Sequence, residues 1–265
     1  MMRSLMVSLL VLMLGACSST TEVIKSPARI QAELAHRNAL LAIRDGRIES
    51  AEYEWRSALL AYQAIDDWSG QGMARLGLAQ IQLRLGQAEA AEQVLAPMLE
   101  IKVFPAVQRS QAALQMAQLI LAADSPDWSR AKSYLTQARA ECAQPCPIGT
   151  QILNVSAKIA LREGDLPAAS VAALQGLALA QTNRAEMAFS QRILAEVSLK
   201  QSDFATAVVW LDQAIVLDRQ SAEPLWLLDD YRLLLEIAKQ SGDLALRRRA
   251  DVHLSALCAA MACTP

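Results

Sequence analysis

Small and bulky apolar residues recur along the chain at fixed distances from short turn sequences. A small residue lies seven positions before the turn and an aliphatic residue follows two positions later, as in Ala39 and Leu41. After the turn, a small residue precedes a bulky one by four positions and a second small one by seven, as in Ala51, Trp55 and Ala58. Positions i, i+4 and i+7 share one face of a helix. Each unit therefore predicts two helices that pack closely around a tight turn.

The pattern recurs about six times. Five segments share it: 38–51, 78–91, 156–169, 194–207 and 234–247. Their turn residues suit a backbone that leaves a helix and reverses: Gly46, Gly86, Gly164, Ser202 and Gly242. A sixth segment, 116–131, fits if its turn is two residues longer. From Ala51 to Ala207 the small residue after the turn recurs at spacings of 40, 40, 38 and 38 residues, which predicts helix-turn-helix units with a period of 38–40.

Breaker residues separate the predicted units. The stretches that we expect to be the connecting loops are 66–71, 101–105, 143–149 and 219–224. Pro97 falls inside a second helix of its pair, which it should kink or shorten. Pro167 follows Asp165 at a helix start, where proline is tolerated.

Two helices around a tight turn, with small residues at these offsets, resemble the tetratricopeptide repeat (TPR). The resemblance covers roughly residues 28 to 260. The chain departs from the family pattern in its period, in the mostly missing aromatic early in the first helix, and in the missing proline at the end of the repeat. The resemblance implies an α-solenoid whose concave surface binds other proteins. The alternative is a globular helical bundle without repeat symmetry.

The composition favours helices throughout. Apolar residues make up 53% of the chain, aromatic residues only 5%, and there are 10 glycines and 9 prolines. Ala, Leu and Gln favour helix, and no run of alternating β-branched residues predicts a strand. We therefore expect an all-α fold.

The first 16 residues look like an export signal. Arg3 precedes an apolar run from Leu5 to Leu14, which is too short to cross a bilayer. The sequence Leu14-Gly15-Ala16-Cys17 resembles the bacterial lipobox, which implies a signal peptide over 1–16 and acyl chains, such as palmitate, on Cys17. A lipidated cysteine and short tether would then occupy 17–27 and the repeat domain 28–265. Ser18 after the cysteine favours the outer membrane, with the domain facing the periplasm.

Four further cysteines form two close pairs in sequence, Cys142/Cys146 and Cys258/Cys263. Pairing between nearest neighbours is the most economical of the three possible connectivities and would indicate an oxidising compartment. Unpaired thiols or zinc are the alternatives, although the only two histidines, His36 and His253, lack ligand spacing. We expect no metal and no cofactor.

Charge and motifs argue against a nucleic-acid partner and against catalysis. The formal net charge is −2, and the short run Arg247–Arg249 is most simply a solvated helix face. No phosphate loop, nucleophile elbow or metal-ligand cluster is present. The pairs Asp66-Asp67 and Asp229-Asp230 are better explained as helix starts and loop edges than as catalytic carboxylates. We expect neither an enzyme nor a small-molecule substrate.

The repeats also align polar residues on the first helix of each unit. Two residues before the turns lie cations: Arg44, Arg84, Arg162 and Lys200. A neighbouring column holds Gln80, Lys158, Glu196 and Glu236, with Asn154, Arg192 and Arg232 one turn earlier. These side chains would face a partner-binding groove, where the cations could hold acidic groups. The alternative for the cations is a favourable interaction with the helix dipole, worth about 0.3–1 kcal/mol each.

These features favour a membrane-anchored periplasmic scaffold that binds another envelope protein in cell-envelope biogenesis. Two alternatives rest on resemblance alone. One is a lipoprotein that activates or regulates a peptidoglycan synthase, and the other is a lipoprotein of pilus or secretin assembly.

Overall fold

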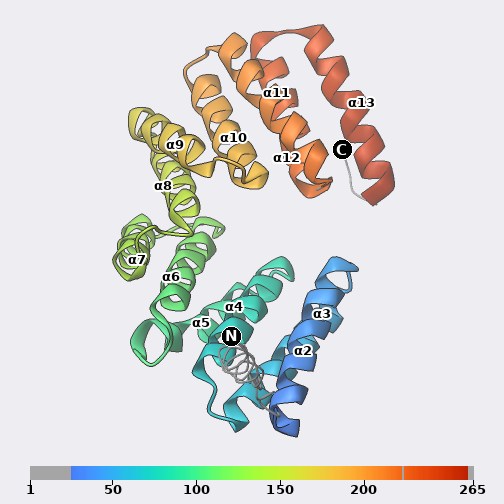
Figure 1. Cartoon of the computed structure of the whole chain (residues 1–265). Helices are drawn as coiled ribbons and strands as arrows, with labels where there is room; N and C mark the ends of the chain where they lie inside the picture. The colour runs from blue at the N-terminus through green and yellow to red at the C-terminus, as the bar shows by residue number, and fades with distance from the viewer. Residues whose placement is uncertain (1–24, 223, 262–265) are drawn as a thin grey trace, which may run out of the picture.

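In a computed structural model, the described residues, 25–222 and 224–261, form twelve α-helices and no strand. The helices are α2 (Pro27–Arg44), α3 (Ile48–Ala64), α4 (Trp68–Arg84), α5 (Ala88–Glu100), α6 (Ala106–Leu121), α7 (Trp128–Glu141), α8 (Gly149–Glu163), α9 (Leu166–Ala180), α10 (Arg184–Lys200), α11 (Phe204–Ser221), α12 (Pro224–Ser241) and α13 (Leu244–Met261). Consecutive helices pack as six hairpins, from α2/α3 to α12/α13, which follow one another in an arc (Figure 1). The predicted all-α, TPR-like solenoid of six repeats is confirmed.

The turns of the hairpins lie at the predicted breaker residues. Five of them contain the left-handed conformation, with φ of +71° at Gly46, +73° at Gly86, +84° at Gly164, +61° at Ser202 and +74° at Gly242. Glycine adopts this conformation without a Cβ clash, whereas Ser202 does so at a cost of about 1–2 kcal/mol. The turn between α6 and α7 is longer and spans residues 122–127, as the sixth segment predicted.

The small residues form the seams between helices. Those before the turns, Ala39, Ala79, Ala157 and Ala195, are at most 2% exposed. Those after the turns, Ala51, Ala91, Ala131, Ala169 and Ala207, are fully buried. The last hairpin departs from this register, because Arg247 is exposed and α13 buries Ala250, Leu254 and Cys258 instead. Its packing therefore begins about one turn later than in the other hairpins.

The connections between hairpins agree with prediction in part. The loop at 101–105 is as predicted, and Pro97 lies in the shortest described helix, the 13-residue α5. The loop predicted at 66–71 is shorter, because the Asp67 side chain accepts a hydrogen bond from the Gly70 nitrogen (2.9 Å) and α4 begins at Trp68. Similarly, α11 continues to Ser221 within the loop predicted at 219–224.

Of the predicted cysteine features, one lies wholly within the described residues. Cys142 and Cys146 form a disulfide across the connection between α7 and α8, with Cα atoms 5.4 Å apart. Cys258 is buried on α13, but its proposed partner Cys263 lies outside the described residues, as do Cys17 and the signal peptide. No helix among the described residues is long and apolar enough to cross a membrane.

A substitution at Gly77 tests how tightly the seam between α3 and α4 is packed. A Cβ at this position would lie 2.3 Å from Cε2 of Trp55, a buried ring that cannot move away easily. We expect Gly77→Ala to lower the free energy of unfolding by about 1–3 kcal/mol through overpacking. This loss would appear although alanine favours a helix interior by about 1 kcal/mol.

Denaturant unfolding measures this effect, with Gly149→Ala as the matched control. A Cβ at Gly149 would meet the end of the flexible Leu179 side chain at 3.0 Å. A Gly77→Ala protein at least as stable as the wild type would contradict the packing described here.

Candidate binding groove on the first-helix face

The first helices of the hairpins form one continuous surface, which we call the first-helix face. Helices α4, α6, α8, α10 and α12 each contact the next in this series. In a curved stack of hairpins the more closely spaced helices lie on the inner, concave side. The first-helix face is therefore the side of the array suited to hold an extended partner.

A hollow of about 450 Å³ opens on this face in the N-terminal half of the array. Its lining comes from α2, α3, α4, α6 and α8, and is His36, Trp55, Met73, Leu76, Gly77, Gln80, Gln111, Leu114, Gln115, Gln118 and Gln151. This volume lies within the range of ordinary ligand-binding sites, about 300–1,000 Å³. The hollow thus joins four successive hairpins in one site.

Five glutamines give the hollow its polar character: Gln80, Gln111, Gln115, Gln118 and Gln151. Within the described part of the chain, none of their amides forms a hydrogen bond with another protein group, and all five are at least partly exposed. Each amide offers two donors and an acceptor. No Asp, Glu, Lys or Arg of the described ranges lines the hollow, so these ranges present hydrogen-bonding groups without charge there.

Aromatic and aliphatic groups complete the lining. The His36 ring packs edge-on against Trp55, with ring centroids 4.8 Å apart. Burial lowers the pKa of His36, which keeps the ring neutral near pH 7. In the described residues, Nδ1 of His36 and Nε1 of Trp55 are buried without a hydrogen-bond partner. An apolar side chain can pack beside these rings and against Leu76 and Leu114.

The predicted groove residues fall into three groups. Gln80 lies in the hollow. The exposed group consists of Arg44, Arg84, Arg162, Lys200, Arg232 and Glu236. Of the cations two residues before the turns, all lie in the last turn of their helices, which fits the helix-dipole interpretation. They do not line the hollow.

The side chains of the third group bind other residues of the protein. This group consists of Asn154, Lys158, Arg192 and Glu196. Lys158 on α8 pairs with Glu196 on α10, with Nζ 2.7 Å from Oε2. Asn154 is fully buried; its Oδ1 accepts a hydrogen bond from the Ser190 hydroxyl (2.6 Å), and its amide donates to Oε2 of Glu186 (2.9 Å). These side chains hold α8 and α10 together.

Arg192 is also buried and lies between two aspartates. Its Nε donates to Oδ1 of Asp230 on α12 (2.6 Å), and its other end pairs with Asp218 on α11. Both carboxylates are fully buried. The interpretation of Asp230 as a helix start or loop edge is therefore wrong: it lies inside α12, where Arg192 compensates part of the cost of burying its charge. Asp67 does lie at a helix start, where its side chain accepts a hydrogen bond from the Gly70 nitrogen and caps α4.

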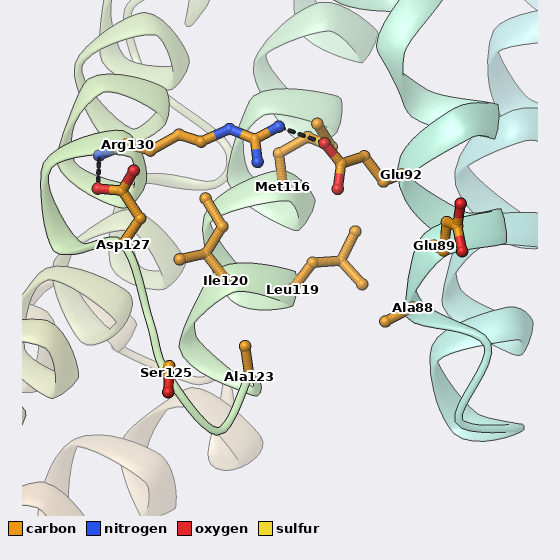
Figure 2. Close-up of a pocket in the computed structure, with 10 residues that line it drawn as sticks. All are labelled: Ala88, Glu89, Glu92, Met116, Leu119, Ile120, Ala123, Ser125, Asp127 and Arg130. Carbon is orange, nitrogen blue, oxygen red and sulfur yellow. Dashed lines mark hydrogen bonds and ion pairs between the residues drawn. The ribbon is translucent and has the colours of Figure 1, made fainter.

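A second hollow, of about 300 Å³, lies at the edge of the array near the hairpin turns (Figure 2). Met116, Leu119 and Ile120 from α6 form its apolar floor, and the long α6–α7 turn forms one wall. The Arg130 side chain reaches across it to pair with Glu92 on α5. This ion pair bridges neighbouring hairpins and spans the hollow, so the more open hollow on the first-helix face is the better candidate site.

Sequence reasoning missed most of the glutamine hollow because it followed the column of cations, which is interrupted in the third unit. A usable signal was present: Gln111, Gln115 and Gln118 have the i, i+4, i+7 spacing of one helix face. Among the described residues, no group of three or more His, Cys, Asp or Glu is placed to hold a metal ion.

Comparison with known proteins is informative for the fold. No protein-family model and no curated protein matches the sequence. Among solved structures, BtubC (BKLC) from P. vanneervenii is similar, with a TM-score of 0.58 and 16% identity over 91% of this chain and 94% of that one. The type IV pilus biogenesis factor PilW is similar with a TM-score of 0.62 and 17% identity, over 88% and 94%. A TPR protein from Thermus thermophilus gives a TM-score of 0.49 and 20% identity, over 84% and 98%.

The Arg192 cluster generates a prediction about stability. Removing Arg192 takes away the cation that lies between two buried carboxylates, so Arg192→Met should cost about 3–5 kcal/mol. Asp230→Asn instead leaves Arg192 paired with Asp218 and should cost much less. Native-state hydrogen exchange of α10–α12 measures both. If the two variants lose equal protection, the charge balance proposed for the cluster is wrong.

The same cluster should respond to pH. Burial raises the pKa of Asp230 above the ordinary range of aspartate, against the opposing effect of Arg192. The folded protein then binds more protons than the unfolded chain at mildly acidic pH, so stability falls as pH rises through the raised pKa. Asp230→Asn should flatten this dependence.

Proposed function

We propose that the chain is a scaffold protein of the cell envelope, anchored by lipid at Cys17 to the outer membrane and facing the periplasm. Its first-helix face binds an extended segment of another envelope protein. The observation that carries this proposal is the hollow of about 450 Å³. In the part of the chain that the structure describes, four hairpins line it with five glutamine amides that have no hydrogen-bond partner, and with no charged side chain. The paired cysteines Cys142 and Cys146 support an oxidising compartment.

The lining of the hollow indicates what it recognises. Glutamine amides can donate to backbone carbonyls and accept from backbone N–H groups, so they suit a polypeptide that enters without secondary structure of its own. A charged side chain would lose water in this uncharged hollow without gaining an oppositely charged partner. We therefore propose a neutral segment with one apolar side chain placed near Trp55, Leu76 and Leu114.

The proposed activity is binding rather than catalysis. Among the described residues that line the hollow, His36 is the only titratable group and none is a nucleophile. Burial lowers the His36 pKa and its Nδ1 has no partner within the described residues, so nothing orients it as a general base.

A second candidate is a lipoprotein of pilus assembly. The fold similarity to PilW favours it, although at 17% identity the similarity extends to the fold alone. A regulator of a peptidoglycan synthase would use the same groove, and identification of the bound partner distinguishes these roles.

The groove can be tested with a photo-crosslinking amino acid introduced at Gln118 in intact cells. We expect a crosslinked envelope protein, and no such product from Gln175, an exposed glutamine on α9 outside the hollow. Gln111→Glu and Gln115→Glu should each lower the yield about tenfold or more, equivalent to 1.4 kcal/mol, because each places a charge in the hollow.

A second pair of variants separates the hollow from the exposed cations. Arg84→Glu with Arg162→Glu should leave the Gln118 crosslink intact, provided that circular dichroism shows an unchanged helix content. Loss of the crosslink in this variant alone would favour recognition by the cations. Equal crosslinking from Gln118 and Gln175 would show that the hollow is not the partner-binding site.

The anchor makes a separate prediction. Cys17→Ala should abolish incorporation of labelled palmitate and release the protein from membranes, since one cysteine carries the acyl chains. Ser18→Asp should keep the label and move the protein to the inner membrane. Labelled palmitate in the Cys17→Ala protein would show that the anchor assignment is wrong.

A further inference from the structure

The outer face of α2 is unusually apolar for an exposed surface. Ile30, Leu34 and Leu41 are 50%, 48% and 43% exposed and lie on one stripe of the helix. Leu40 beside them is 49% exposed. Alanines on the opposite side of α2 pack against α3, so this stripe takes no part in the hairpin core.

The position of α2 explains why this stripe is uncovered. In later hairpins, the corresponding side of each first helix packs on the preceding hairpin, as α4 packs on α3. No described hairpin precedes α2. Repeat arrays normally end in units whose outer surface is polar, because the terminal face meets water. The apolar face of α2 therefore requires a specific explanation.

The charged residues of the stripe indicate what kind of surface would cover this face of α2. Arg37 and Arg44 are exposed on it, and no acidic residue is among the exposed positions of α2 itself. Arg44 pairs with Asp45 just after the helix end, with Nε 3.4 Å from Oδ1, so Arg37 is the cation of the stripe without an ion pair among the described residues. Glu33, on the flank of α2, is held by Lys25, with Nζ 2.7 Å from Oε2. Apolar side chains with only cations among them are typical of helices that lie in the interface of an anionic membrane.

We propose that the outer face of α2 docks on an anionic phospholipid surface. The proposal rests on the anchor at Cys17, which the proposed function includes. About ten residues separate Cys17 from Pro27, and they span at most roughly 35 Å. A lipid attached at Cys17 would hold α2 beside the membrane, and the apolar stripe with its two arginines would supply the second contact that stable anchoring requires.

A second copy of the chain fits this face less well. An antiparallel pairing of two α2 helices about their centres would bring the Arg37 side chains of both copies together. The face of an 18-residue helix, about 27 Å long and 10–12 Å wide, also offers on the order of 300 Å². A standard protein interface buries about 800 Å² on each partner.

The test is depth-dependent quenching of tryptophan by brominated lipid. The lipidated full chain carrying Leu34→Trp is reconstituted in vesicles of phosphatidylglycerol and brominated phosphatidylcholine. The matched control carries Leu60→Trp, which lies on α3 and is 67% exposed in the wild type. Wild-type protein supplies the signal of the five native tryptophans. We expect at least about twofold stronger quenching at position 34, because an interfacial helix buries its apolar face about 5–10 Å.

Arg37→Glu should reduce the quenching at position 34 to the control level in the anionic vesicles. It should have little effect in vesicles of brominated phosphatidylcholine alone, where charge does not contribute. Equal quenching at positions 34 and 60 overturns the docking surface. The docking surface is also wrong if position 34 shows no extra quenching and instead crosslinks to a protein in cells. That result would identify a protein as the occupant.

Flotation of the same vesicles separates this inference from the anchor. A chain that floats with the vesicles but shows no extra quenching at position 34 is anchored without docking, and only the docking surface fails. A wild-type chain that neither floats nor carries lipid overturns both proposals.

Discussion

The close approach of helices along seams of small residues is the constraint on which the rest of the structure depends. Ala39 and Ala51 are fully buried on facing helices of the first hairpin, and Gly77 lets α4 approach the ring of Trp55. A side chain larger by one methyl group at such a position displaces a whole helix rather than a flexible neighbour. The seams fix the spacing of the first helices, and this spacing determines how wide the groove is.

The fold could be predicted from the sequence because the seams and turns repeat. A small residue at a constant distance from Gly46, Gly86 or Gly164 requires the same local geometry each time, so the pattern predicts both helices and their packing. The last hairpin broke the pattern because α13 packs through Ala250 instead of position 247. That shift depends on contacts with α12, which one sequence does not show.

The candidate site was harder to predict. A column of polar residues in the sequence does not show which side chains bind other residues of the same protein and which remain free to bind a partner. Arg192 and Asn154 occupy the expected column, but Asp218, Asp230 and Ser190 satisfy them from neighbouring helices. Ser190 and Asp230 both lie twelve residues before a turn residue, Ser202 and Gly242, at a position that the sequence pattern did not single out. Gln111, Gln115 and Gln118 on α6 remain available because the facing helices offer them no charged partner. The residues available to bind a partner are thus those whose hydrogen-bonding groups are not already bonded within the protein.

The polar contacts between first helices differ between the two halves of the array. From α8 onward, ion pairs and buried hydrogen bonds join successive first helices, as between Lys158 and Glu196. Between α4 and α6 such a contact lies near the helix starts, from Gln108 to the Ser69 carbonyl. Further along α6, Gln111, Gln115 and Gln118 form no hydrogen bond with another side chain or backbone group of the described residues. A segment bound among these glutamines would thus form the polar contacts between first helices that the C-terminal half forms with its own side chains.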